Sequence, residues 1–224
     1  MKRHILSFVF ILSAIGIITG CSTLSKKDTE YAEFRSNDLS TFFLRGPVMS
    51  VERWDKFSNE YVNDLSFDKN GNLVRFGDST AYVNRDEQGR IIALSNYLPT
   101  EYLMDSHWDY VYTYTPDGNV DMCEGGAYWC QIVSIFSDHD NNGNPMKETV
   151  SMEDDEGNSS VENYTYEYIQ FDDFGNWTAR KVGSHTSRNY DLNTGDRIKE
   201  SDKTDNFIEH RRITYYTRDQ FLKK

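Results

Sequence analysis

The sequence predicts an all-β fold, an antiparallel β-meander of long hairpins with about ten to twelve strands. Short runs alternate aromatic or β-branched residues with polar ones, as in "DYVYTYT" and "YTYEYIQF". Phrases rich in Asp, Asn and Gly separate these runs, and no segment keeps a 3.6-residue apolar period with helix caps. Two forms remain open, a single strongly twisted sheet and a half-barrel.

A turn phrase recurs five times, as "FDKNGN", "RDEQGR", "YTPDGN", "HDNNGN" and "FDDFGN". In four of these phrases Asp precedes Gly by three residues, and in the other Thr115 takes that place with Pro116 after it. A type I turn favours Asp first, Pro second and Gly fourth, and a Gly with positive φ closes the hairpin with a bulge. Each phrase is therefore predicted to be the tip of a β-hairpin.

The first 20 residues have the pattern of a secretory signal peptide. A basic start is followed by an apolar stretch from Ile5 to Ile18 that is too short to span a bilayer stably. Its ending, Ile-Thr-Gly-Cys, resembles the lipobox of bacterial lipoproteins. That resemblance implies cleavage before Cys21 and lipidation of this cysteine, and Ser22 after it implies the outer membrane, on the periplasmic or the surface side.

The mature chain divides into a linker and a domain. Residues 21–40 are polar without a clear period, so they are predicted to form a flexible tether behind the lipidated cysteine. Residues 41–224 have the length of a single β-meander domain. The net charge of −12 argues against nucleic acid as a partner.

Several phrases together resemble a known family. "LRGPVMSVERW" (44–54), the repeated aromatic-Asp-x-x-Gly-Asn phrases and "FDDFGNWTARKV" (171–182) look like small YD/RHS-repeat-like lipoproteins of the Gram-negative cell envelope. The resemblance covers about residues 44–216. It implies an antiparallel sheet with long hairpins, and most members of that family have no known activity.

Cys123 and Cys130 bracket the segment "EGGAYW". A four-residue loop from Gly125 to Tyr128 would place the two cysteines opposite each other, at a distance that suits a disulfide in an oxidising envelope. A two-residue turn at Gly125 and Gly126 would instead leave two free thiols. The sequence favours the disulfide and leaves both readings open.

One stretch of alternating carboxylates and amides resembles the start of a calcium loop. It consists of Asp138, Asp140, Asn142 and Asn144. The twelfth position is Thr149, where the calcium motif needs a bidentate Glu, and turn chemistry alone explains the Asp and Gly of this stretch. The segment is a candidate metal site with a plain turn as its alternative.

Four aromatic residues are candidates for ligand binding, because flat rings stack on sugars and are enriched at protein contacts. They are Trp108, Tyr128, Trp129 and Trp177. The alternative is that these rings pack against the sheet's own face.

No nucleophile, base and orienting group can be assembled from the sequence, and no cofactor motif is present. The prediction is a non-enzymatic, lipid-anchored envelope protein that presents a β-sheet surface to a protein partner. The alternative is a glycan-binding lipoprotein that holds a polysaccharide with exposed aromatics. A partner role predicts a large apolar patch or an open sheet edge on the domain.

Overall fold

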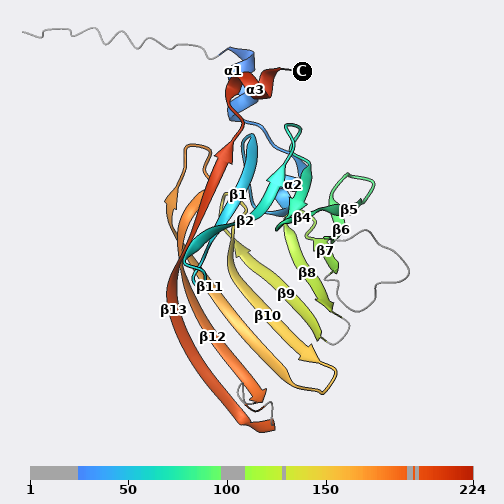
Figure 1. The fold of residues 1–224 in the computed structure, drawn as a ribbon, viewed down its shortest axis with the longest axis vertical. Coiled ribbons are helices and arrows are strands. Elements are labelled where there is room, and N and C mark those ends of the chain that lie inside the picture. Colours follow the sequence, from blue (N-terminus) through green and yellow to red (C-terminus); the bar gives the residue numbers. More distant parts are fainter. Residues whose placement is uncertain (1–24, 97–108, 128–129, 191–193, 195–196, 224) are drawn as a thin grey trace, which may run out of the picture.

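The computed structural model describes residues 25–96, 109–127, 130–190, 194 and 197–223. Thirteen strands form one antiparallel sheet in the order β4-β3-β2-β1-β13-β12-β11-β10-β9-β8-β7-β6-β5. The sheet curves into a nearly closed barrel, which confirms the all-β meander and its half-barrel form (Figure 1). The strands are β1 (Val48–Asp55), β2 (Glu60–Phe67), β3 (Leu73–Phe76), β4 (Ser79–Thr80), β5 (Tyr82–Arg85), β6 (Ile91–Ser95), β7 (Asp109–Tyr114), β8 (Val120–Ala127), β9 (Cys130–His139), β10 (Pro145–Asp154), β11 (Ser159–Phe171), β12 (Trp177–Tyr190) and β13 (Arg197–Tyr215).

The two ends of the sheet are joined through one residue. β4 pairs with β3 and β5 pairs with β6, while the backbone N–H of Ala81, between β4 and β5, donates to Val74 O at 3.0 Å. The stretch 79–85 therefore passes from the first strand of the sheet to the last. Joining the ends in this way hides the edges that an open sheet would expose at this position.

The five predicted turns are confirmed, and they all lie at one end of the sheet. They follow β2, β5, β7, β9 and β11, strands that run in the same direction, and we call this end the turn end. In each turn the backbone N–H of the Gly donates to the backbone carbonyl of the residue three positions earlier, at 2.9–3.0 Å. The same turn hydrogen bonds also form at Asp154 to Asn158 after β10, at the opposite end of the sheet, so the phrase recurs because this turn closes hairpins.

Two short helices precede the sheet, α1 (Lys26–Ala32) and α2 (Asn37–Thr41), and a third, α3 (Arg218–Leu222), follows it. α1 contacts α3 at the turn end, where the Tyr31 hydroxyl donates to Tyr216 O at 2.8 Å (Figure 1). The flexible tether predicted for residues 21–40 is wrong over its described part, residues 25–40. Ser25 and Ser36 cap the two helices, and apolar residues beyond Ser36 are drawn into the core.

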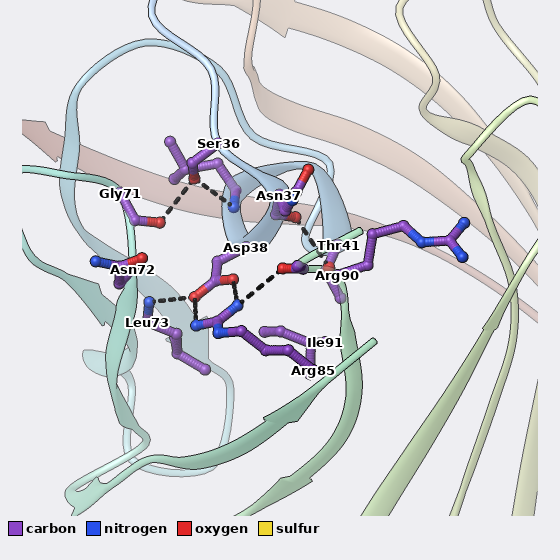
Figure 2. Close-up of polar contacts among 12 residues, drawn as sticks. Ser36, Asn37, Asp38, Thr41, Gly71, Asn72, Leu73, Arg85, Arg90 and Ile91 are labelled. Atoms are coloured by element: carbon purple, nitrogen blue, oxygen red, sulfur yellow. Dashed lines mark hydrogen bonds and ion pairs between the residues drawn. The ribbon is translucent and has the colours of Figure 1, made fainter. Parts of the chain in front are cut away.

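The first turn of α2 is bound to neighbouring hairpin tips. Ser36 Oγ accepts the N–H of Leu39 at 3.1 Å and donates to Gly71 O at 2.7 Å. Asp38 lies beside it, accepts the N–H of Leu73 at 2.7 Å and forms an ion pair with Arg85 (Figure 2). The N-terminal segment is thus fixed to the turn end by polar contacts as well as by its apolar side chains.

The hydrophobic core fills the barrel at the turn end. Leu39 and Leu44 of the N-terminal segment pack with buried residues of β1, β2, β3, β6, β7 and β8. Phe42 meets Phe67 and Tyr112 edge to face, with ring centroids 6.2 and 6.3 Å apart. Such ring pairs add about 0.5–1.5 kcal/mol each beyond the area they bury. Part of the inner wall below this core remains uncovered, and the candidate site lies there.

In the part of the chain that the structure describes, no helix has the length and apolar character needed to cross a membrane.

Candidate functional site

A cavity of about 260 Å³ lies inside the curve of the sheet, next to the end of α2. Its apolar wall includes Phe42, Phe43 and Phe136, and its polar wall is formed by charged side chains of β1, β2, β10, β12 and β13. These strands are far apart in the chain and meet only because the meander closes through the pairing of β1 with β13. We call this space the inner cavity.

Arg180 and Glu209 form a buried ion pair on the wall of the inner cavity. They are directly opposite each other in the pairing of β12 with β13, so both side chains lie on the same face of the sheet. Arg180 Nε and Nη2 each lie 2.7 Å from Glu209 Oε2. The charge of Arg180 is therefore compensated by a neighbouring strand.

Among the described residues, Arg211 has no such partner. Its Nε donates to Trp177 O at 2.6 Å, and its guanidinium carbon lies 3.8 Å from the centroid of the Trp177 ring. Its Nη2 is buried and has no hydrogen-bond partner among the described residues. Burial, with the nearby charge of Arg180, lowers the pKa of Arg211 to about 9, so the side chain still carries its charge at neutral pH.

Asp64 is placed by a bulge in β2. Val51 pairs with Leu65 and the next residue, Glu52, pairs with Asn63, so Asp64 is the extra residue between them. Its Oδ1 lies 3.9 Å from Arg53 Nε. Although 41% of its side chain is accessible, partial burial raises the pKa of Asp64 above its ordinary value, because the carboxylate loses solvation that Arg53 replaces only in part.

Trp177 is the one predicted ligand-binding aromatic that falls in the described part of the chain. Only 6% of the residue is accessible, so its ring packs on the sheet's own face, which was the stated alternative to ligand binding. The guanidinium of Arg180 lies 4.4 Å from the ring centroid, in addition to that of Arg211. Trp108, Tyr128 and Trp129 lie outside the described residues, as do residues 1–20 and Cys21.

The predicted pairing of Cys123 with Cys130 is wrong, and both cysteines are free. Cys123 is opposite Ser134 and Cys130 is opposite Ala127 in the pairing of β8 with β9. Four residues of strand, about 13 Å, separate these positions, whereas a disulfide spans about 4.4–6.8 Å between Cα atoms. The predicted loop fails because Gly125 and Gly126 lie inside β8 rather than in the connection.

At Asp138, Asp140, Asn142 and Asn144 the structure shows the plain turn that was the alternative to calcium, and each of these side chains contacts a protein group. Asp140 Oδ1 accepts the backbone N–H groups of Asn142 and Asn144 at 2.7 and 2.9 Å. Asp138 forms an ion pair with Lys147 at 2.5 Å, and Asn142 Oδ1 accepts from Arg45 at 2.7 Å. Across the described ranges, no group of three or more His, Cys, Asp or Glu side chains could hold a metal ion.

A second feature lies on β13, which is 19 residues long. β12 pairs with most of its length, but β1 pairs only with its last part, from Arg211 to Tyr215. Within the described structure, residues 203–210 therefore have a strand on one side only. We call this stretch the free edge of β13. The sequence did not reveal it, because strand alternation shows where a strand runs and not how far each neighbour accompanies it.

A groove of about 270 Å³ runs between the free edge and the turn that joins β1 to β2. Phe57, Phe207 and Ile208 line it and are exposed by 89%, 44% and 52%. Lys56 Nζ lies 5.5 Å from the ring centroid of Phe57 and 5.6 Å from that of Phe207, which brings the turn and the edge together. An unpaired strand beside exposed apolar side chains is a surface that can bind an extended peptide.

Comparisons with known proteins add little to this geometry. No protein-family model matches the chain, and no curated protein matches it significantly. Among solved structures, the chain is similar to a porin-like protein from Bacteroides vulgatus, with a TM-score of 0.39 and 11% sequence identity. That match covers 76% of this chain and 98% of the porin-like chain.

Proposed function

We propose that the protein is a non-enzymatic, lipid-anchored protein of the outer membrane that binds an envelope protein partner through the free edge of β13. The observation that supports this proposal most directly is that β1 leaves β13 after Arg211, while β12 continues beside it. The backbone N–H and C=O groups that point away from β12 are then available to a strand of the partner. Main-chain hydrogen bonds would supply affinity in this mode of recognition, and side-chain pockets would supply specificity.

The groove beside the edge indicates which kind of partner segment can bind there. An extended segment lying along residues 203–210 would place alternate side chains over the sheet face that carries Phe207 and over the face that carries Ile208. Phe57 and Phe207 form an apolar site for one of these side chains. The partner segment is therefore extended and carries an apolar residue at the position that enters the groove.

The position of the N-terminal segment determines how the proposed lipid anchor would orient the domain. α1 lies at the turn end beside α3, whereas the free edge runs toward the opposite end of the sheet (Figure 1). A chain anchored through Cys21 would hold the turn end toward the membrane. The free edge would then extend away from the lipid, where an envelope protein can reach it.

The test compares two exposed isoleucines on the sheet. Ile208 lies on the free edge and is 52% exposed, whereas Ile135 of β9 is 46% exposed and lies between two paired strands. The lipidated protein is cross-linked in native envelopes as wild type, Ile208→Lys and Ile135→Lys, and the captured proteins are identified and quantified.

We expect one stoichiometric partner with the wild type and with Ile135→Lys, and its loss with Ile208→Lys. Equal capture by Ile208→Lys would contradict binding at the free edge. Recovery of polysaccharide in place of a protein, lost in a Trp129→Ala variant, would instead support the glycan-binding alternative.

A further inference from the structure

Three arginines meet on the wall of the inner cavity, and two of them face each other directly. Arg53 of β1 is opposite Arg211 of β13 in the strand register, and both line the cavity together with Arg180. Like charges directly opposite on one face of a sheet are destabilising. The side chain of Arg53 is 51% exposed, so solvent screens its charge, whereas the Nη2 of Arg211 is buried and depends on a negative group nearby.

Among the described residues, no carboxylate of the cavity forms an ion pair with Arg211, although Glu209 and Asp64 lie near enough to interact with its charge. Glu209 is paired with Arg180, and Asp64 is the carboxylate nearest to Arg53. Glu148 accepts the hydroxyl hydrogen of Tyr166 from the neighbouring strand. In the described part of the chain, Arg211 thus has no carboxylate partner, and its buried Nη2 has no hydrogen bond. A buried, unpaired charged donor is expensive to maintain, and a bound anion would remove that cost.

The rest of the cavity wall limits the kind of anion. Phe42, Phe43, Tyr112 and Phe136 give it an apolar side facing the arginines. Its volume of about 260 Å³ is below the range of about 300–1,000 Å³ that is typical of sites for drug-sized ligands. The space suits a small molecule with one anionic group and a compact apolar body.

We propose that the inner cavity binds a small organic carboxylate, whose carboxylate lies between Arg53 and Arg211 and whose apolar body packs against Phe42 and Phe136. A carboxylate matches the fork of donors on a guanidinium, which favours it over a hydroxyl or an amide. Arg53 and Glu209 line both this cavity and the groove at the free edge, but the carboxylate would bind side chains, whereas the partner strand would pair with the backbone of β13.

The test uses benzoate as the probe and isothermal titration calorimetry of the purified full-length protein. Benzamide has the same ring without the charge, and acetate has the charge without the ring. We expect saturable binding of benzoate at one site per chain, and binding of benzamide and of acetate weaker by roughly tenfold or more. Equal affinities for benzoate and benzamide, or no saturable benzoate binding, would overturn the proposal.

Two variants locate the site. Arg211→Gln removes the inward-facing charge, whereas Arg212→Gln removes the neighbouring charge, which is 60% exposed and pairs with Glu52 on the other face. We expect Arg211→Gln to weaken benzoate binding by roughly tenfold or more and Arg212→Gln to leave it unchanged. Unchanged binding in a folded Arg211→Gln protein would overturn the assignment. The comparison of benzoate with benzamide on the wild type decides the proposal even where the variant does not fold.

Discussion

Asn176 holds the backbone of Arg45 from both sides, across 131 residues of sequence. Arg45 N donates to Asn176 Oδ1 at 2.8 Å, and Asn176 Nδ2 donates to Arg45 O at 2.8 Å. In other turns of the same phrase the corresponding Asn binds the Asp of its own turn, as Asn72 does with Asp68 at 2.9 Å. In the last turn, the Asp172 oxygen that this leaves free accepts from Tyr215 instead. One turn of the repeat therefore binds the N-terminal segment, through the backbone of Arg45.

Replacing Asn176 with Ala is expected to destabilise the protein by about 2–3 kcal/mol, because the substitution leaves the N–H and C=O of Arg45 without their partner. Asn72→Ala is the matched control, since Asn72 is exposed and its side chain binds only within its own turn. Its expected cost is about 1 kcal/mol or less. Urea unfolding measures both values, and equal costs for the two variants would contradict this role of Asn176.

Asp38 is expected to be the most sensitive polar residue of α2, because it is buried and holds both Arg85 and the N–H of Leu73 (Figure 2). Asp38→Ala should cost about 3 kcal/mol, the lower end of the range for breaking a buried ion pair, since the Arg85 side chain is 30% exposed. Asp38→Asn should cost about 1 kcal/mol less, because its amide oxygen can still accept from Leu73. The measurement is again unfolding in urea, and identical losses would show that only the charge matters.

The two cysteines should be free and should differ in reactivity. Burial raises the pKa of Cys123 to about 11, whereas the less enclosed Cys130 has a smaller upward shift of its pKa. Because the thiolate is the reactive form, iodoacetamide at pH 8 should modify Cys130 before Cys123 in the folded protein. Mass spectrometry of the unreduced, denatured protein should show both residues alkylated. A protein that takes up no label until it is reduced would contain the disulfide that the strand register excludes.

Asp64 should make the wild type less stable as the pH rises. Burial raises its pKa in the folded state above the ordinary value, so the folded protein binds this proton more tightly than the unfolded chain. The stability that this proton contributes is present at low pH and is lost as the pH rises through the folded-state pKa. The stability of Asp64→Asn relative to the wild type should therefore increase between about pH 4 and pH 7.

Asp55 gives the control of opposite sign. Hydrogen bonds from the side chain of Ser58 and from the backbone of Phe57 lower the pKa of Asp55. Its contribution is present above the unfolded-state pKa and is lost as the pH falls through the folded-state pKa. The stability of Asp55→Asn relative to the wild type should therefore decrease as the pH rises to about 5 and stay level above it. A pH dependence of the same sign in both variants would show that the two carboxylates do not differ as described.

The hairpins could be predicted from the sequence because their chemistry is local. The Asp and the Gly of each phrase, such as Asp68 and Gly71, form the turn hydrogen bonds without help from the rest of the chain. The burial of Leu39 could not be predicted, because it depends on strands that follow much later. The same holds for Arg211, which reads as an ordinary strand residue until the closure of the sheet brings it opposite Arg53. The disulfide predicted between Cys123 and Cys130 was wrong because Gly125 and Gly126, which usually mark a turn, are part of a strand here.

Hydrogen exchange along β13 tests the central claim most directly. In the free protein, backbone amides of residues 203–210 that point away from β12 should exchange much faster than amides of β11, which pairs with a strand on each side. Adding the purified partner should slow the exchange of these edge amides, because a strand of the partner takes their hydrogen bonds. Protection that appears elsewhere while the edge amides keep their free-state rates would contradict strand addition at β13.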